Sequence, residues 1–295
     1  MSPAWLTVGS SLAFAAMGVC VKVASAQYSA GEMVFYRSLV GAVVMALLAR
    51  VRGNSLASPV PSMHFWRSAS GVFSLLLWFY ALTGLPLATA MTLNYMSSVW
   101  MALFLIGGAA LVGSGRIDGR LVAAVLLGFA GVALVLRPTV DHQQLWHGLT
   151  GLLSGMLAAT AYLQVTALGK AGEPEERIVF YFSVGGLVVG ALWMLALGAS
   201  AHTARRLALL LAIGVLATLG QTLMTRAYRI GTTLANASLQ YLGIVFSFGF
   251  GVLLFNDPVT VSALAGIVLI VGAGLYATLL RSRQQPAATP PVQDT

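Results

Sequence analysis

The sequence predicts an all-α membrane protein with ten transmembrane helices as two inverted five-helix repeats. Three observations carry this prediction. First, 58% of the residues are hydrophobic and only 8% are charged, whereas a soluble domain typically carries about 25% charge. Second, the apolar residues fall into ten stretches of membrane-spanning length. Third, the second half of the chain resembles the first.

Ten stretches are long and apolar enough for a spanning helix, which needs about 20 residues. All 10 prolines fall between these stretches or in the tails, as expected of a residue that removes a helical hydrogen bond and collects at helix ends. In chain order the predicted helices cover residues 4–25, 31–51, 63–84, 87–112, 119–137, 147–169, 176–199, 205–228, 232–256 and 259–281.

Lysine and arginine predict the orientation of these helices, because cytoplasmic loops carry an excess of both. With the N-terminus in the cytoplasm, 11 of the 16 basic residues fall on that side. The remaining basic residues fall on the opposite side and are Lys22, Arg37, Arg137, Arg205 and Arg206. We therefore predict that both termini are cytoplasmic. Residues 282–295 are predicted to form a disordered cytoplasmic tail.

Two matched segments indicate an internal repeat. Residues 34–38 (VFYRS) correspond to 179–183 (VFYFS) at an offset of 145, and residues 92–95 (TLNY) correspond to 238–241 (SLQY) at an offset of 146. The predicted units are residues 4–137 and 147–281. Five spans per unit is an odd number, so the second unit enters the bilayer from the opposite side. Inverted repeats are a transporter architecture with the substrate near the membrane midplane.

The segments ATAMTLNY (88–95) and LANASLQY (234–241), together with LLFNDP (253–258), carry a family resemblance. With the ten short-looped spans, they resemble the drug/metabolite transporter superfamily and, within it, the EamA-type exporters. Asp257 stands where that family commonly has Glu. The resemblance implies a transporter of the bacterial inner membrane that exports amino acids, aromatic or other neutral ones, and related small metabolites by alternating access.

Polar side chains inside spans are costly and usually face the bundle interior or a wet cavity. Amides and hydroxyls can bind the carboxylate and the ammonium of an amino acid, and aromatic rings can cover its side chain. In a competing interpretation, these groups hold helices together or form interfacial belts. The candidate substrate-binding residues are Phe14, Met17, Trp78, Tyr80, Asn94, Tyr95, Ser98, Trp100, Tyr162, Gln164, Gln221, Gln240 and Tyr241.

Charged residues are predicted to stay away from the membrane centre. Lys22, Glu32 and Arg37 fall near the outer ends of the first two spans, where Lys22 and Glu32 are expected to pair, and Arg67 is assigned to the cytoplasmic side. Without a central carboxylate there is no evident site for a driving proton, so we expect facilitated movement of the solute down its gradient. Without central basic residues, a nucleotide sugar is disfavoured as cargo.

The spans contain no Gly-x-Ser-x-Gly motif, paired carboxylates or histidine cluster, so no catalytic residue, metal ligand or cofactor is predicted. An intramembrane enzyme is the alternative outside transport, and a broad-specificity drug/metabolite efflux carrier is the alternative within it. We expect a monomer whose partners are a small-molecule substrate and membrane lipids, with no role in nucleic-acid binding.

Overall fold

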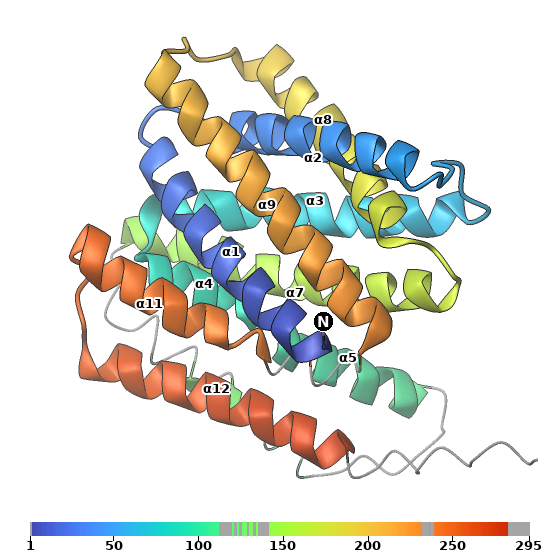
Figure 1. Ribbon diagram of the computed structural model, residues 1–295. Helices are drawn as coiled ribbons and strands as arrows, with labels where there is room; N and C mark the ends of the chain where they lie inside the picture. The colour runs from blue at the N-terminus through green and yellow to red at the C-terminus, as the bar shows by residue number, and fades with distance from the viewer. Residues whose placement is uncertain are drawn as a thin grey trace, which may run out of the picture.

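The computed structural model describes residues 2–111, 142–231, 236 and 239–282, with isolated residues between 120 and 134. Every regular element in this part of the chain is an α-helix (Figure 1). The helices are α1 (Pro3–Ala24), α2 (Ala30–Val51), α3 (Pro61–Gly84), α4 (Leu87–Tyr95), α5 (Ser97–Leu111), α7 (His142–Lys170), α8 (Glu175–Leu197), α9 (Ala204–Ile230), α11 (Leu242–Phe255) and α12 (Val261–Ser282).

These helices fit the predicted spans closely except at the fourth and ninth, where turns interrupt the chain. Five of those described are long and apolar enough by themselves to cross a membrane, namely α1, α2, α7, α8 and α9. The predicted fifth span, residues 119–137, and the tail lie largely outside the described residues. The all-helical prediction is confirmed for the part of the chain that the structure describes.

Local sequence explains where several helices begin. Pro3 and Pro61 occupy the first turn of α1 and α3, where a missing N–H leaves no hydrogen bond unmade. Helix α2 begins with a capping box, in which the Glu32 N–H donates to Ser29 Oγ (3.3 Å) and the Ser29 N–H donates to the Glu32 carboxylate (2.9 Å). The predicted boundary at residue 31 therefore falls within one residue of the observed start.

The predicted fourth span is two helices rather than one. Helix α4 ends at Tyr95, Met96 forms a turn, and α5 begins at Ser97. In the second half, the described chain turns at Gln240 and Tyr241, directly before α11, which lies within one residue of the repeat-equivalent position at the offset of 146. Neither turn contains proline or glycine. At the first break, Gly155 of α7 packs against the Leu93 carbonyl so closely that a Cβ atom there would collide with it, so helix packing accompanies the break.

The two halves of the chain interlock through antiparallel helix pairs. Helix α3 packs along α7, α1 along α9 and α2 along α8, while α12 lies at one edge of the bundle against α4 and α5 (Figure 1). The α2–α8 contact is reciprocal. Gly41 faces the Ser183 hydroxyl and Gly186 faces the Ser38 hydroxyl, each at a distance that a Cβ atom would not permit.

The outer surface of the bundle is apolar. Leu195, Leu253 and Val261 expose 84%, 79% and 85% of their surface. A bundle in water would cover such positions with polar side chains, whereas lipid accepts them. The polar groups instead gather inside the bundle and at its two ends.

Candidate substrate cavity

A cavity of about 70 Å³ lies where the two halves meet. Its walls come from α1, α2, α3 and α4 of the first half and from α7, α8 and α9 of the second. This volume is well below the roughly 300–1,000 Å³ of pockets that hold drug-sized ligands. A solute therefore fits only when the surrounding helices move apart.

The cavity brings together seven of the thirteen candidate residues predicted from the sequence. They are Phe14, Met17, Trp78, Asn94, Tyr95, Tyr162 and Gln221. Asn94 lies at the end of α4, directly before the helix break, and its amide donates to Ser154 Oγ of α7 (3.0 Å). Ser74 of α3 also lines the cavity and donates to the Ser154 carbonyl (2.8 Å). The break in the fourth span thus places an amide and an aromatic ring beside α7.

The other six candidates lie outside the lining. Tyr80 is 43% exposed and stacks on His147, with ring centroids 4.6 Å apart, and Trp100 stacks on Phe104. Gln240 accepts a hydrogen bond from the Tyr228 hydroxyl (3.3 Å), so its position favours helix packing. The remaining three are the half-buried Ser98, the part-buried Gln164, which accepts from Ser70, and the buried Tyr241.

Two arginines line the same cavity, which corrects the expectation that Arg37 and Arg67 lie near span ends on opposite sides. Arg37 is 4% exposed and Arg67 is 2% exposed. Their guanidinium carbons lie 4.9 and 4.1 Å from the centroid of the same ring, Phe182 of α8. Arg37 is seven residues into α2, about 10 Å along the helix, and its long side chain extends further still. The position of Arg37 near the span end therefore hides how deep its guanidinium lies.

Neither arginine forms an ion pair with a carboxylate of the described residues. Every carboxylate in this part of the chain is engaged at one end of the bundle or the other. These carboxylates are Glu32, Glu173, Glu175, Glu176 and Asp257, while Asp118, Asp141 and Asp294 lie outside the described residues. The cavity therefore holds two buried cations whose charge no described side chain balances.

The polar atoms left without partners in this lining are hydrogen-bond donors. Nε of Arg37, Nε and Nη1 of Arg67, the indole nitrogen of Trp78 and the amide nitrogen of Gln221 are buried and have no partner among the described residues. Arginine and the tryptophan indole donate only and cannot accept. A bound molecule that satisfies them must supply acceptor atoms.

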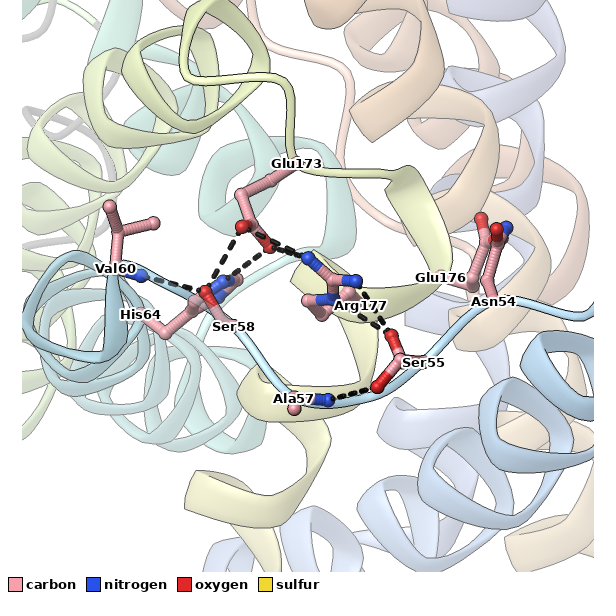
Figure 2. Close-up of polar contacts among 9 residues, drawn as sticks. All are labelled: Asn54, Ser55, Ala57, Ser58, Val60, His64, Glu173, Glu176 and Arg177. Carbon is pink, nitrogen blue, oxygen red and sulfur yellow. Dashed lines mark hydrogen bonds and ion pairs between the residues drawn. The ribbon is translucent and has the colours of Figure 1, made fainter.

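One end of the bundle is closed by a network around Glu173, which we call the Glu173 end (Figure 2). The loop between α2 and α3 meets the turn between α7 and α8 there. The buried Glu173 carboxylate accepts from Ser58 Oγ (3.0 Å), His64 Nε2 (3.0 Å) and Arg177 Nη1 (3.0 Å), and Arg177 also donates to the Ser55 carbonyl (2.7 Å).

Burial would raise the pKa of Glu173, but hydrogen bonds from His64, Arg177 and Ser58 outweigh it and hold the pKa below its ordinary value of 4.5. Beside this carboxylate, Arg52 pairs with both Glu175 and Glu176 at 3.3 Å. Arg229 of α9 also pairs with Glu175. At the Glu173 end, Arg52 thus joins the two halves by ion pairs, whereas the pairs of Arg177 and Arg229 lie within the second half.

The opposite end, which we call the Asp257 end, is closed by fewer charges. The Lys22 ammonium pairs with Asp257 (3.1 Å), and Asp257 also accepts from the Leu87 N–H at the start of α4 (2.8 Å), where the helix dipole favours a negative charge. The expected pairing of Lys22 with Glu32 is therefore wrong. Glu32 instead accepts from the Ser200 hydroxyl (2.9 Å). Among the described residues, no group of three or more potential metal ligands gathers.

The fold and the cavity define a class of protein. A multi-helix membrane bundle with a cavity between its halves, lined by both apolar and polar side chains, is the arrangement of a small-solute transporter. Residues 1–137 match the family described as EamA-like transporter family. The pseudopaline exporter CntI of Pseudomonas aeruginosa is 34% identical over 268 residues, which cover 91% of this chain and 93% of that protein. The chain belongs to the EamA-like transporter family, within the drug/metabolite transporter superfamily.

More distant relatives carry other names. The riboflavin transporter of Brucella anthropi is 24% identical over 91% of this chain and 95% of its own length. The S-adenosylmethionine uptake transporter of Rickettsia bellii is 24% identical over 83% of this chain and 82% of its own. A solved crystal structure shares the fold with a TM-score of 0.68 at 19% identity, and the match covers 96% of this chain and 99% of that one. The relatives of this chain are thus named for different solutes and directions.

Proposed function

We propose that the protein exports small amino-acid-like metabolites across the bacterial inner membrane by alternating access. The observation that carries this proposal is a cavity between the two halves with a polar closure at each end. Opening one closure while the other stays shut would expose the cavity to one side at a time. In this proposal both termini are cytoplasmic, the Glu173 end faces the cytoplasm, and one chain suffices for transport.

Several contacts support an inverted repeat with units 4–137 and 147–281. Helices α2 and α8 occupy equivalent places in the two units and run antiparallel, as a twofold axis in the membrane plane requires. Swapping the units exchanges the Gly41–Ser183 contact with the Gly186–Ser38 contact. The same swap exchanges the α3–α7 pair with the α9–α1 pair, and it brings the turn at Met96 within one residue of the turn at Gln240 and Tyr241.

Export of an amino-acid-like solute is supported by the lining and by one relative. Phe14, Trp78, Tyr95 and Tyr162 provide aromatic walls, and Asn94 and Gln221 provide amides. The 34% identical relative is named as an exporter, whereas the S-adenosylmethionine relative is named for uptake. Facilitated movement is our proposal for the coupling, because each described carboxylate lies at an end of the bundle rather than at the cavity.

Counterflow in proteoliposomes tests the proposal. Vesicles are loaded with an unlabelled solute, and uptake of the labelled solute is followed across a panel of amino acids, carboxylated derivatives and cationic drugs, with protein-free vesicles as the control. We expect transient accumulation of amino-acid-type solutes. Flux of none of them would contradict the export proposal, and preferential flux of the drugs would favour the broad-specificity carrier. Uphill accumulation under an imposed pH difference would contradict facilitated movement.

A further inference from the structure

We propose that the cavity selects net-anionic solutes that carry two carboxylates and an apolar or aromatic group, with Arg37 and Arg67 each holding one carboxylate. The inference rests on the proposed function, since it takes the cavity as the place where the cargo binds. It also departs from the expectation based on the sequence, which was a neutral amino acid, because it names dicarboxylate anions as the cargo.

The first observation that supports a dianionic solute is the charge of the cavity. A buried cation needs a partner, because taking it out of water is strongly unfavourable. The glutamates that could neutralise Arg37 and Arg67 are held at the ends of the bundle by other residues. Contact with the face of Phe182 offsets part of the loss of hydration but leaves the net charge in place. Two positive charges thus remain for a bound solute to balance.

The geometry of the two arginines suits a single small diacid. Both guanidinium carbons lie over Phe182, and the sum of their distances to its centroid limits their separation to at most 9.0 Å. A guanidinium can bind a carboxylate through two parallel N–H···O bonds. One molecule with two carboxylates can therefore engage both arginines at once, whereas a zwitterion would bring its ammonium next to a second cation.

The remaining lining agrees with an acceptor-rich solute. The unpartnered nitrogen atoms of Trp78 and Gln221 add two donors to those of the arginines. An ionised carboxylate accepts hydrogen bonds and donates none, so a dianion supplies the complementary atoms. Phe14, Tyr95 and Tyr162 provide aromatic rings against which an apolar or aromatic part of the same molecule can pack.

Binding to the purified protein in detergent tests the inference without requiring transport. Three probes share one benzyl group and differ in charge: 2-phenylethylamine is a cation, phenylalanine a zwitterion and benzylsuccinate a dianion. Isothermal titration calorimetry measures the affinity of each for the wild type and for R37Q, R67Q and R50Q. Arg50 lies on the same helix as Arg37 but is exposed, which makes R50Q the matched control.

We expect the wild type and R50Q to bind benzylsuccinate at least about tenfold more tightly than phenylalanine, and 2-phenylethylamine most weakly. R37Q and R67Q should each weaken benzylsuccinate binding by roughly 10- to 100-fold, as expected for the loss of a charge-assisted hydrogen bond. Size-exclusion profiles and thermal unfolding verify that each variant is folded. If a glutamine variant does not fold, R37K or R67K replaces it, since lysine keeps the charge but cannot bind a carboxylate through two parallel hydrogen bonds.

The inference is overturned if wild-type protein binds phenylalanine as tightly as benzylsuccinate, if it binds no benzylsuccinate, or if the preference survives both glutamine substitutions. These outcomes are separate from a failure of the proposed function. A protein that prefers benzylsuccinate in detergent but moves no solute in vesicles would support the anion site and contradict export.

Discussion

The arginines of the cavity and those of the Glu173 end differ in their partners. Arg52, Arg177 and Arg229 at the end of the bundle pair with glutamates. Arg37 and Arg67 are more deeply buried and pair with no described carboxylate. The end therefore has balanced charges, among which the pairs of Arg52 join the two halves, and the cavity has unbalanced charges that a solute can satisfy.

This difference has an energetic consequence. Removing one partner of a buried ion pair is strongly destabilising because the other charge stays behind, whereas removing an unpaired buried charge relieves a desolvation penalty. Loss of a charge should thus lower stability at the Glu173 end and raise it in the cavity, whereas it should lower transport mainly in the cavity.

The largest effect is expected on transport. The double variant R37Q/R67Q should reduce benzylsuccinate counterflow by about 100-fold or more, because it removes two charge-assisted contacts worth roughly 1.5–3 kcal/mol each. R229Q should stay within a few-fold of the wild type, since Arg52 still pairs with Glu175. Initial rates in proteoliposomes give both numbers, and equal losses in the two variants would contradict the distinction between the regions.

Removal of the Glu173 charge should give the largest change in stability. E173Q leaves Arg177 without its carboxylate partner and weakens the contact to the buried His64. We expect the free energy of unfolding to fall by about 2–4 kcal/mol. Thermal or denaturant unfolding in detergent measures it, and K22M, which breaks the more exposed pair with Asp257, should lower it by only about 1 kcal/mol. Similar losses in both variants would contradict this ranking.

Replacement of the cavity arginine should change stability in the opposite direction. R67M removes a buried, unpaired charge and keeps an unbranched apolar side chain against Phe182, so we expect the free energy of unfolding to rise by about 1–2 kcal/mol. The same variant should bind benzylsuccinate poorly. A clear loss of stability in R67M would mean that Arg67 has a structural partner.

Asn94 allows a near-isosteric charge to be added to the lining. N94D places a carboxylate in the cavity that contains both arginines, so it should compete with the solute and lower benzylsuccinate affinity by about tenfold. The thermal midpoint should rise, because the cavity then holds its own counter-ion. Tighter dianion binding in N94D would contradict a positive cavity. S74N, a neutral change in the same lining, is the control.

The smallest effect is a pH dependence at the Glu173 end. Since the pKa of Glu173 is held below its ordinary value of 4.5, this group contributes stability that is fully present above pH 4.5 and is lost as the pH falls through the lowered pKa. The difference in thermal midpoint between the wild type and E173Q should therefore be constant near neutral pH and shrink as the pH falls below about 4.5. A difference that grows on acidification would contradict the lowered pKa.

The span positions were predictable because hydrophobic length and proline spacing are local properties of the sequence. The break at Met96 was not, because neither proline nor glycine marks it and the close approach of Gly155 comes from a helix far away in the chain. Seven of the candidate residues meet in the cavity, since polar and aromatic residues inside a span tend to face inward.

The cavity arginines do not follow from sequence position, because the distance of a residue from a span end does not give the depth that its long side chain reaches. A signal was nevertheless present in the sequence. Neither Arg37 nor Arg67 has an acidic residue three or four positions away on its own helix, so no local ion pair could explain a charge within the span. Which residues lie opposite them depends on the packing of the two halves, which sequence spacing does not specify.

A structure of the protein with 4-bromobenzylsuccinate bound would examine the anion site most directly, with the bromine locating the ligand by its anomalous scattering. We predict that the ligand occupies the cavity between the halves, with one carboxylate within about 3.2 Å of Arg37 nitrogen atoms and the other equally close to those of Arg67. A ligand bound outside the cavity, or inside it with both carboxylates away from the two arginines, would contradict the assignment.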